Sequence, residues 1–103
     1  MNTPTEIADF ARNVVRQERD GLTALLESID TSSISQAVDI ILKSDGYLIV
    51  AGVGKSGHVG QKIAASFAST GTPAFFMHPT EASHGDLGMI AKGSILLALS
   101  NSG

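Results

Sequence analysis

The residues best suited to chemistry in this chain form one short segment, Gly52-Val53-Gly54-Lys55-Ser56-Gly57-His58. An apolar run over 47–51 precedes this segment, and a helical pattern over Val59–Thr70 follows it. Glycines let the backbone turn sharply and approach a ligand, and the N-terminus of a helix attracts negative charge. Lys55 adds a positive charge there and Ser56 adds a hydroxyl. The segment therefore predicts a site for a phosphorylated small molecule.

Three other interpretations of the glycine segment compete with this one. The spacing of Gly52, Gly54 and Gly57 fits the dinucleotide fingerprint, but that fingerprint requires an acid at the end of the next strand. Here the next strand ends in Met77-His78-Pro79, which disfavours a nicotinamide or flavin site. A P-loop requires glycine where Ile49 stands, so a nucleoside triphosphatase is also disfavoured. In the third interpretation the glycines only pack a strand against a helix, but a lysine is an odd choice for packing alone.

Composition narrows the class of protein. The 103 residues suffice for one small domain, and 43% of them are hydrophobic, which favours a packed core over disorder. A net charge of −3 argues against a surface for nucleic acid or anionic membrane. The absence of cysteine excludes disulfides and thiolate chemistry. Because neither a secretion signal nor a membrane-spanning apolar run is present, we expect a cytoplasmic protein.

The chain begins with the pattern of a long helix. Thr3-Pro4-Thr5-Glu6 combines an N-cap, a proline at the first helical position and a capping-box glutamate. Apolar residues then recur at helical spacing from Ile7 to Ile29, which predicts a helix about 40 Å long. Such a helix is longer than a small domain is wide. Packing against another subunit and packing across its own domain both remain open.

The rest of the chain alternates between helical and strand patterns. A capping box over 33–36 predicts a second helix that ends at 44–46, and a loop is expected over 80–90 with one helical turn. The predicted strands are 47–53, 74–77 and 94–99, with a turn at Lys92-Gly93 before the last. This alternation predicts a parallel, doubly wound α/β sheet. Ligands bind at the carboxyl ends of such strands, where the segments 52–58, 78–86 and 100–103 should meet.

Four motifs in this order resemble a known family. They are Gly52–His58, Ala68–Pro73, Glu81–Met89 and Ser100-Asn101-Ser102-Gly103. Together they are similar to the sugar isomerase (SIS) domain, and within it to the arabinose 5-phosphate isomerases. The resemblance covers nearly the whole chain. The first motif alone would be weak evidence for the family. The resemblance is specific because all four motifs occur in the same order.

The resemblance implies a fold and a reaction. The fold is a three-layer α/β/α sandwich of flavodoxin-like type around a doubly wound parallel sheet, here reduced to about three strands after two helices. The reaction interconverts D-arabinose 5-phosphate and D-ribulose 5-phosphate through an enediolate, and it supplies precursors of lipopolysaccharide. The family requires no cofactor. The resemblance implies a pentose phosphate substrate, a cytoplasmic location and usually a homotetramer, and the net charge of −3 argues against nucleic acid or membrane partners.

The resemblance also implies roles for particular residues. Lys55 matches a lysine important for catalysis, and His84 matches a histidine that can bind an inhibitory zinc ion. The other residues that match substrate- or phosphate-binding positions are Gly54, Ser56, Gly57, His84, Ser100, Asn101 and Ser102. Glu81 and Asp86 are the carboxylates near the predicted edge, and one of them would be the base if the chain were complete.

The chain departs from the family in length. The family's catalytic glutamates and a further histidine are expected beyond Gly103, so we expect residues 1–45 to form a helix pair and 46–103 the first part of an SIS domain. The chain alone is then expected to be inactive. Three alternatives remain open: a sugar-phosphate-binding module without chemistry, part of a nucleotide-binding oxidoreductase, and an assembly domain built on the first helix.

Overall fold

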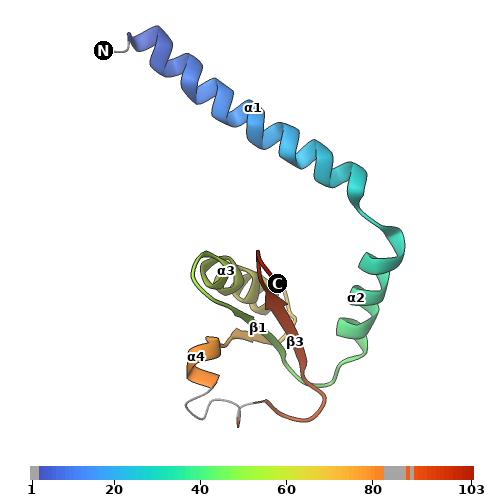
Figure 1. Cartoon of the computed structure of the whole chain (residues 1–103). Helices are drawn as coiled ribbons and strands as arrows, with labels where there is room; N and C mark the ends of the chain where they lie inside the picture. Colours follow the sequence, from blue (N-terminus) through green and yellow to red (C-terminus); the bar gives the residue numbers. More distant parts are fainter. Residues whose placement is uncertain (1–2, 83–87, 89) are drawn as a thin grey trace. The chain divides into compact units, whose positions relative to one another are not determined.

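A computed structural model describes residues 3–82, 88 and 90–103 of the chain (Figure 1). Its elements follow the order α1, α2, β1, α3, β2, α4 and β3. The chain divides into two compact units, one up to Ser35 and one from Gln36 to Gly103. The residues with candidate chemistry therefore all belong to the second unit.

Helix α1 spans Pro4–Ser28 and confirms the predicted start. The Thr3 hydroxyl accepts the Glu6 N–H at 3.1 Å, and the Thr3 N–H donates to the Glu6 carboxylate at 2.7 Å. These two bonds satisfy backbone groups that a helix end otherwise leaves unpaired. Gly21 lies inside the helix without interrupting it. The apolar side chains of α1 are exposed, including Phe10 at 70% and Leu26 at 73%.

Helix α2 spans Thr31–Lys43 and starts earlier than the capping box at Ser33 predicted. The Asp30 carboxylate accepts the N–H groups of Ser32 and Ser33 at 3.3 and 2.9 Å and the Ser33 hydroxyl at 2.6 Å. These hydrogen bonds, led by the Ser33 hydroxyl, lower the pKa of Asp30 below its ordinary value. Asp30 is thus the cap, because a carboxylate that accepts two amides outcompetes the serine hydroxyl.

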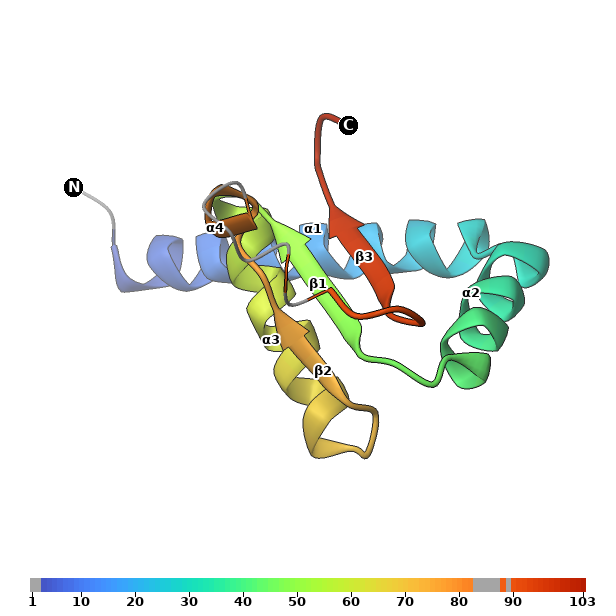
Figure 2. The same cartoon turned by 90° about the horizontal axis from the view of Figure 1, so that it is seen from below.

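Three parallel strands form the sheet, in the order β2-β1-β3 (Figure 2). They are β1 at Leu48–Gly52, β2 at Ala74–Phe76 and β3 at Ile95–Leu99. Each residue of β1 is buried, as its continuous apolar run predicted. The chain passes from β1 to β2 on one side and then returns to pair β3 on the other side. This reversal confirms the predicted doubly wound α/β class.

Helix α3, Lys55–Ser69, packs against the sheet and closes the core. Val50 and Ala64 are buried there with Phe67 and Phe76 against them. The helix ends as predicted at Gly71, whose φ of 100° is positive, and the Thr72 N–H reaches back to the Phe67 carbonyl at 2.9 Å. The short helix α4, Pro79–Ala82, supplies the single turn expected in the following loop.

The amino ends of β1 and β3 are tied together by their preceding turns. The Ser44 hydroxyl donates to the Gly93 carbonyl at 2.7 Å, and the Ile95 N–H donates to the Tyr47 carbonyl at 2.9 Å. Gly93 has a φ of 89°, as suits the predicted turn. These contacts set the pairing of β3 with β1 and hence the position of the residues that follow β3. Within the described part of the chain, no helix has the length and apolar character that a membrane crossing requires.

Candidate functional site

The site begins where β1 passes into α3. Gly54 caps the helix with φ 61° and ψ −129°, a conformation that favours glycine. The His58 N–H donates to the Gly54 carbonyl at 3.2 Å and closes the first helical turn. The sequence pattern placed the helix start at Val59, but the helix begins four residues earlier, at Lys55. Lys55 and Ser56 therefore stand in the first turn of α3, beside N–H groups that have no partner within the helix.

A hollow of about 340 Å³ lies between this first turn and the end of β3. It is lined by Lys55, Ser56, Val59, Leu99, Ser100 and Asn101. Strands β1 and β3 are neighbours, and the chain reverses its direction across the sheet between them. Crevices at such reversal points are where open α/β sheets bind ligands. The hollow therefore brings together, at the predicted edge, two segments that lie about 45 residues apart in the sequence.

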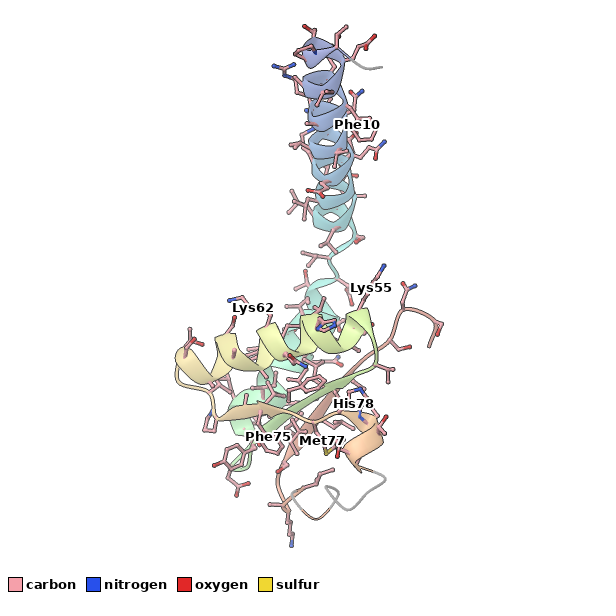
Figure 3. All side chains as sticks on the ribbon, turned by 90° about the vertical axis from the view of Figure 1, so that its left-hand side faces the viewer. Phe10, Lys55, Lys62, Phe75, Met77 and His78 are labelled. Carbon is pink, nitrogen blue, oxygen red and sulfur yellow. The ribbon has the colours of Figure 1, made fainter. Side chains whose placement is uncertain are left out.

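Charge at the hollow favours an anion. The lining residues that the structure describes include one cation, Lys55, and no carboxylate. Figure 3 shows Lys55 at the end of α3 next to β1, whereas Lys62 points away from the sheet. Among the described residues, the ion pairs involve Arg12, Arg19 and Lys43, so the Lys55 ammonium remains available to a ligand. The helix dipole adds partial positive charge at the same place.

The turn after β3 is held by a hydrogen bond within its own residues. The Gly103 N–H donates to the Ser100 hydroxyl oxygen at 2.9 Å. The hydroxyl proton of Ser100 stays free to donate to a ligand, since a serine can accept and donate at once. Ser100 and Asn101 line the hollow, but Ser102 is not among its lining residues. Neither are Gly54 and Gly57, of which Gly57 is buried.

The loop after β2 is only partly described. His78 accepts the Thr80 N–H at its Nδ1 at 3.1 Å, and its ring meets Phe76 edge to face at 6.4 Å between centroids. It therefore caps α4. His84 and Asp86, proposed from the sequence for ligand or metal binding, lie outside the described residues. Glu81 is described and exposed on α4. No group of three metal-binding side chains occurs in the described ranges.

Sequence reasoning missed the two apolar residues of the hollow, Val59 and Leu99. Val59 stands four residues after Lys55, so both lie on one face of α3 once the helix is known to begin at Lys55. That early start was the missing information. Leu99 belongs to the predicted strand 94–99, and only the pairing of β3 with β1 brings its end to the first turn of α3.

A second cavity lies at the opposite, amino end of the sheet. It measures about 190 Å³, and its lining includes Ile41, Leu48, Thr72 and Ile95. None of its lining residues is ionisable. The cavity offers no group for acid, base or anion chemistry. The hollow beside Lys55 is therefore the better candidate site.

Comparisons with known proteins identify relatives of this chain in sequence. The family model of the SIS domain matches residues 40–103. Arabinose 5-phosphate isomerase KdsD of Pseudomonas aeruginosa is 54% identical over 103 residues, which is all of this chain and 31% of that protein. The KdsD of Yersinia pestis is 56% identical over 92 residues, 89% of this chain and 28% of that protein.

Similarity extends to solved structures. A structure of an Escherichia coli CFT073 protein in complex with arabinose 5-phosphate superimposes with a TM-score of 0.91 at 36% identity. The match covers 97% of this chain and 53% of that one. The chain thus spans about three tenths of the length of the curated relatives it matches.

Proposed function

Because this chain belongs to the SIS domain family, we propose that it is part of an aldose–ketose isomerase that interconverts D-arabinose 5-phosphate and D-ribulose 5-phosphate. Two curated relatives carry the name arabinose 5-phosphate isomerase at more than half identity. The observation that carries the proposal is the hollow itself, where a lysine, two serines and an asparagine converge.

The groups around the hollow suit the phosphate end of the substrate. The first turn of α3 offers backbone N–H groups, and the hydroxyls of Ser56 and Ser100 can donate to phosphate oxygens. Gly54, Gly57, Asn101 and Ser102 stay proposed members of this grip, as does His84 for substrate or inhibitory zinc.

Lys55 is proposed to stabilise negative charge during the reaction. Aldose–ketose isomerisation removes a proton next to the carbonyl, and the resulting enediolate carries charge on oxygen. A fixed ammonium beside that oxygen lowers the barrier because it interacts more strongly with the transition state than with the neutral carbonyl. The reaction also needs a base to move the proton. The described residues of the lining include no carboxylate, and we propose that the base comes from outside these lining residues.

The test is turnover by the full-length protein that contains this chain. Arabinose 5-phosphate would be supplied and ribulose 5-phosphate measured over time, with glucose 6-phosphate and unphosphorylated arabinose as comparison substrates. We expect turnover of arabinose 5-phosphate and none of unphosphorylated arabinose. The 103-residue chain by itself is expected to be inactive. Equal turnover with and without the phosphate would contradict the assignment of the hollow.

A second candidate is a sugar-phosphate-binding module without chemistry. The described lining residues favour it, because their ammonium, hydroxyl and amide groups suit binding better than proton transfer. Calorimetric binding of arabinose 5-phosphate by the full-length protein, without any turnover, would support this candidate. Thermal stabilisation by NAD but not by pentose phosphates would instead support the dinucleotide-binding alternative.

Several wider features belong to the same proposal. We propose that residues 1–45 form a helix pair ahead of an SIS domain that starts at residue 46. We also propose that the protein is a homotetramer. A cytoplasmic location and a supply of precursors for lipopolysaccharide fit this activity. They rest on the family and not on any group in the hollow.

A further inference from the structure

The contact between β1 and the first turn of α3 is unusually close. A Cβ atom added at Gly57 would lie 2.8 Å from the Gly52 carbonyl oxygen. A Cβ added at Gly52 would lie 2.9 Å from the carbonyl carbon and oxygen of Ser56. Both obstacles are backbone atoms, which cannot turn aside as a side chain can. Each of these two positions therefore accepts only glycine while the strand and the helix keep their present separation.

The close contact has a consequence for the hollow. Ser56 directly precedes Gly57, and Lys55 precedes Ser56, so all three lie in the turn that rests on Gly52. Lys55 and Ser56 line the hollow, whereas Gly57 is buried and is not among its lining residues. Leu99 is paired with Gly52 across the sheet. Gly52, at the end of β1, therefore contacts the first turn of α3 and also pairs with Leu99 on the β3 side of the hollow.

We propose that Gly52 and Gly57 are positioning residues, which set the distance of Lys55 and Ser56 from Ser100 and Asn101 through their close contact with each other. Any side chain at Gly57 must raise the contact to Gly52 from 2.8 Å to above 3.0 Å, because Cβ atoms essentially never approach other heavy atoms more closely than that. The first turn of α3 would then lift off β1. The ammonium of Lys55 and the N–H groups of this turn would shift relative to Ser100 and Asn101, and such displacements weaken interactions that depend on exact position.

Gly60 provides the matched control. It is buried in the same helix, one turn later, and it also packs tightly, with its added Cβ at 3.0 Å from Phe76 and 3.2 Å from Val50. Its neighbours are side-chain atoms, which can shift, and they do not line the hollow. Gly57→Ala and Gly60→Ala gain the same helix propensity. They differ in what the new methyl group meets.

The experiment compares Gly57→Ala, Gly52→Ala and Gly60→Ala in the full-length protein by crystal structure and by calorimetry with inorganic phosphate and arabinose 5-phosphate. We expect the first two variants to move the first turn of α3 away from β1 and to weaken phosphate binding about 10-fold or more. Gly60→Ala should keep both the turn and the affinity. An unmoved first turn in Gly57→Ala would overturn the inference. So would equal losses of affinity in Gly57→Ala and Gly60→Ala.

Two further outcomes are also decisive. If Gly57→Ala and Gly52→Ala both fail to fold while Gly60→Ala folds, the contact serves the whole fold and the positioning role is wrong. The affinity arm rests on the proposed function, but the structural arm does not. A wild-type protein without isomerase activity, whose Gly57→Ala variant still shows the displaced turn, would therefore refute the proposed reaction and support the positioning role.

Discussion

Position rather than residue type distinguishes the two lysines of helix α3. Lys55 stands in the first turn and lines the hollow, while Lys62 lies two turns later and points away from the sheet (Figure 3). Both are exposed. Of the two lysines, only Lys55 lies near the free backbone N–H groups of the helix start and near the hydroxyl of Ser100 after β3. The chemistry of this residue therefore comes from its place at the helix start.

Replacing Lys55 tests this at the residue scale. In the full-length protein, Lys55→Ala should lower kcat/KM for arabinose 5-phosphate by about 100-fold or more, the loss typical of removing one stabiliser of a developing oxyanion. The measurement is steady-state kinetics. Lys62→Ala removes the same charge from the same helix and should leave kcat/KM nearly unchanged. A similar loss in both variants would mean that general charge, and not the position of Lys55, matters.

Ser100 offers a second residue-scale prediction. Its hydroxyl holds the turn through Gly103 and keeps a proton for the ligand. Ser100→Ala loses both functions and should raise the KM for arabinose 5-phosphate about 10-fold, in line with the roughly 1.5–3 kcal/mol of a hydrogen bond to a charged group. Ser100→Thr retains the hydroxyl and should recover most of the affinity. A threonine variant as weak as the alanine variant would argue against the hydroxyl.

At the scale of elements, the Asp30 cap makes the stability of helix α2 dependent on pH. Hydrogen bonds from Ser33 and Ser32 lower the pKa of Asp30 in the folded chain. The contribution of this cap is fully present above the ordinary aspartate pKa of 3.8 and is lost as the pH falls through the lowered folded pKa. Asp30→Asn keeps an uncharged cap and should remove this acid-induced loss of helicity. Circular dichroism from neutral to acid pH measures the difference, and unchanged acid behaviour in Asp30→Asn would contradict it.

Replacement by alanine should have opposite effects on stability at Gly71, just after α3, and at Gly21, in the middle of α1. Gly71 has a φ of 100° and open space around an added Cβ, so Gly71→Ala should destabilise the second unit by about 1 kcal/mol through backbone strain alone. Gly21 also has open space but helical backbone, so Gly21→Ala should raise helix stability by up to about 1 kcal/mol. Urea unfolding and helical content measure the two effects. Gly71→Asn should lose less than Gly71→Ala, because asparagine tolerates a positive φ.

At the scale of the whole molecule, α1 carries apolar residues that its own unit leaves exposed. They include Ile7, Phe10, Leu22, Leu25 and Leu26. Helices of this kind are stabilised chiefly by packing of their apolar face. If the protein is a homo-oligomer held in part by α1, the double substitution Leu22→Glu and Leu26→Glu should shift the full-length protein to smaller species in analytical ultracentrifugation. The control is the double substitution Arg16→Glu and Asn13→Glu, at polar positions of the same helix. If the leucine variant has the same mass as the control variant and the wild type, α1 is not an oligomer contact.

The sequence by itself determined the kinds of element and their order. Capping residues, periodic apolar spacing and continuous apolar runs are local signals, and they predicted α1, the three parallel strands and the end of α3 at Gly71. The resemblance of four motifs predicted the family, which the match over residues 40–103 confirmed. Local signals failed at two helix starts, where the Asp30 carboxylate caps α2 and the backbone conformation of Gly54 starts α3.

Only the tertiary structure decided which of the candidate residues meet. Lys55 and Ser100 are brought to one hollow because β3 pairs with β1 on the side opposite to β2, and no local pattern specifies that neighbour. The separate roles of the glycines likewise depend on a distance between strand and helix. Gly54 is needed because its backbone has a positive φ, whereas Gly57 is needed because a side chain there would clash with the backbone of Gly52. A sequence records that glycine is present, but the reason lies in atoms that the fold brings within van der Waals contact.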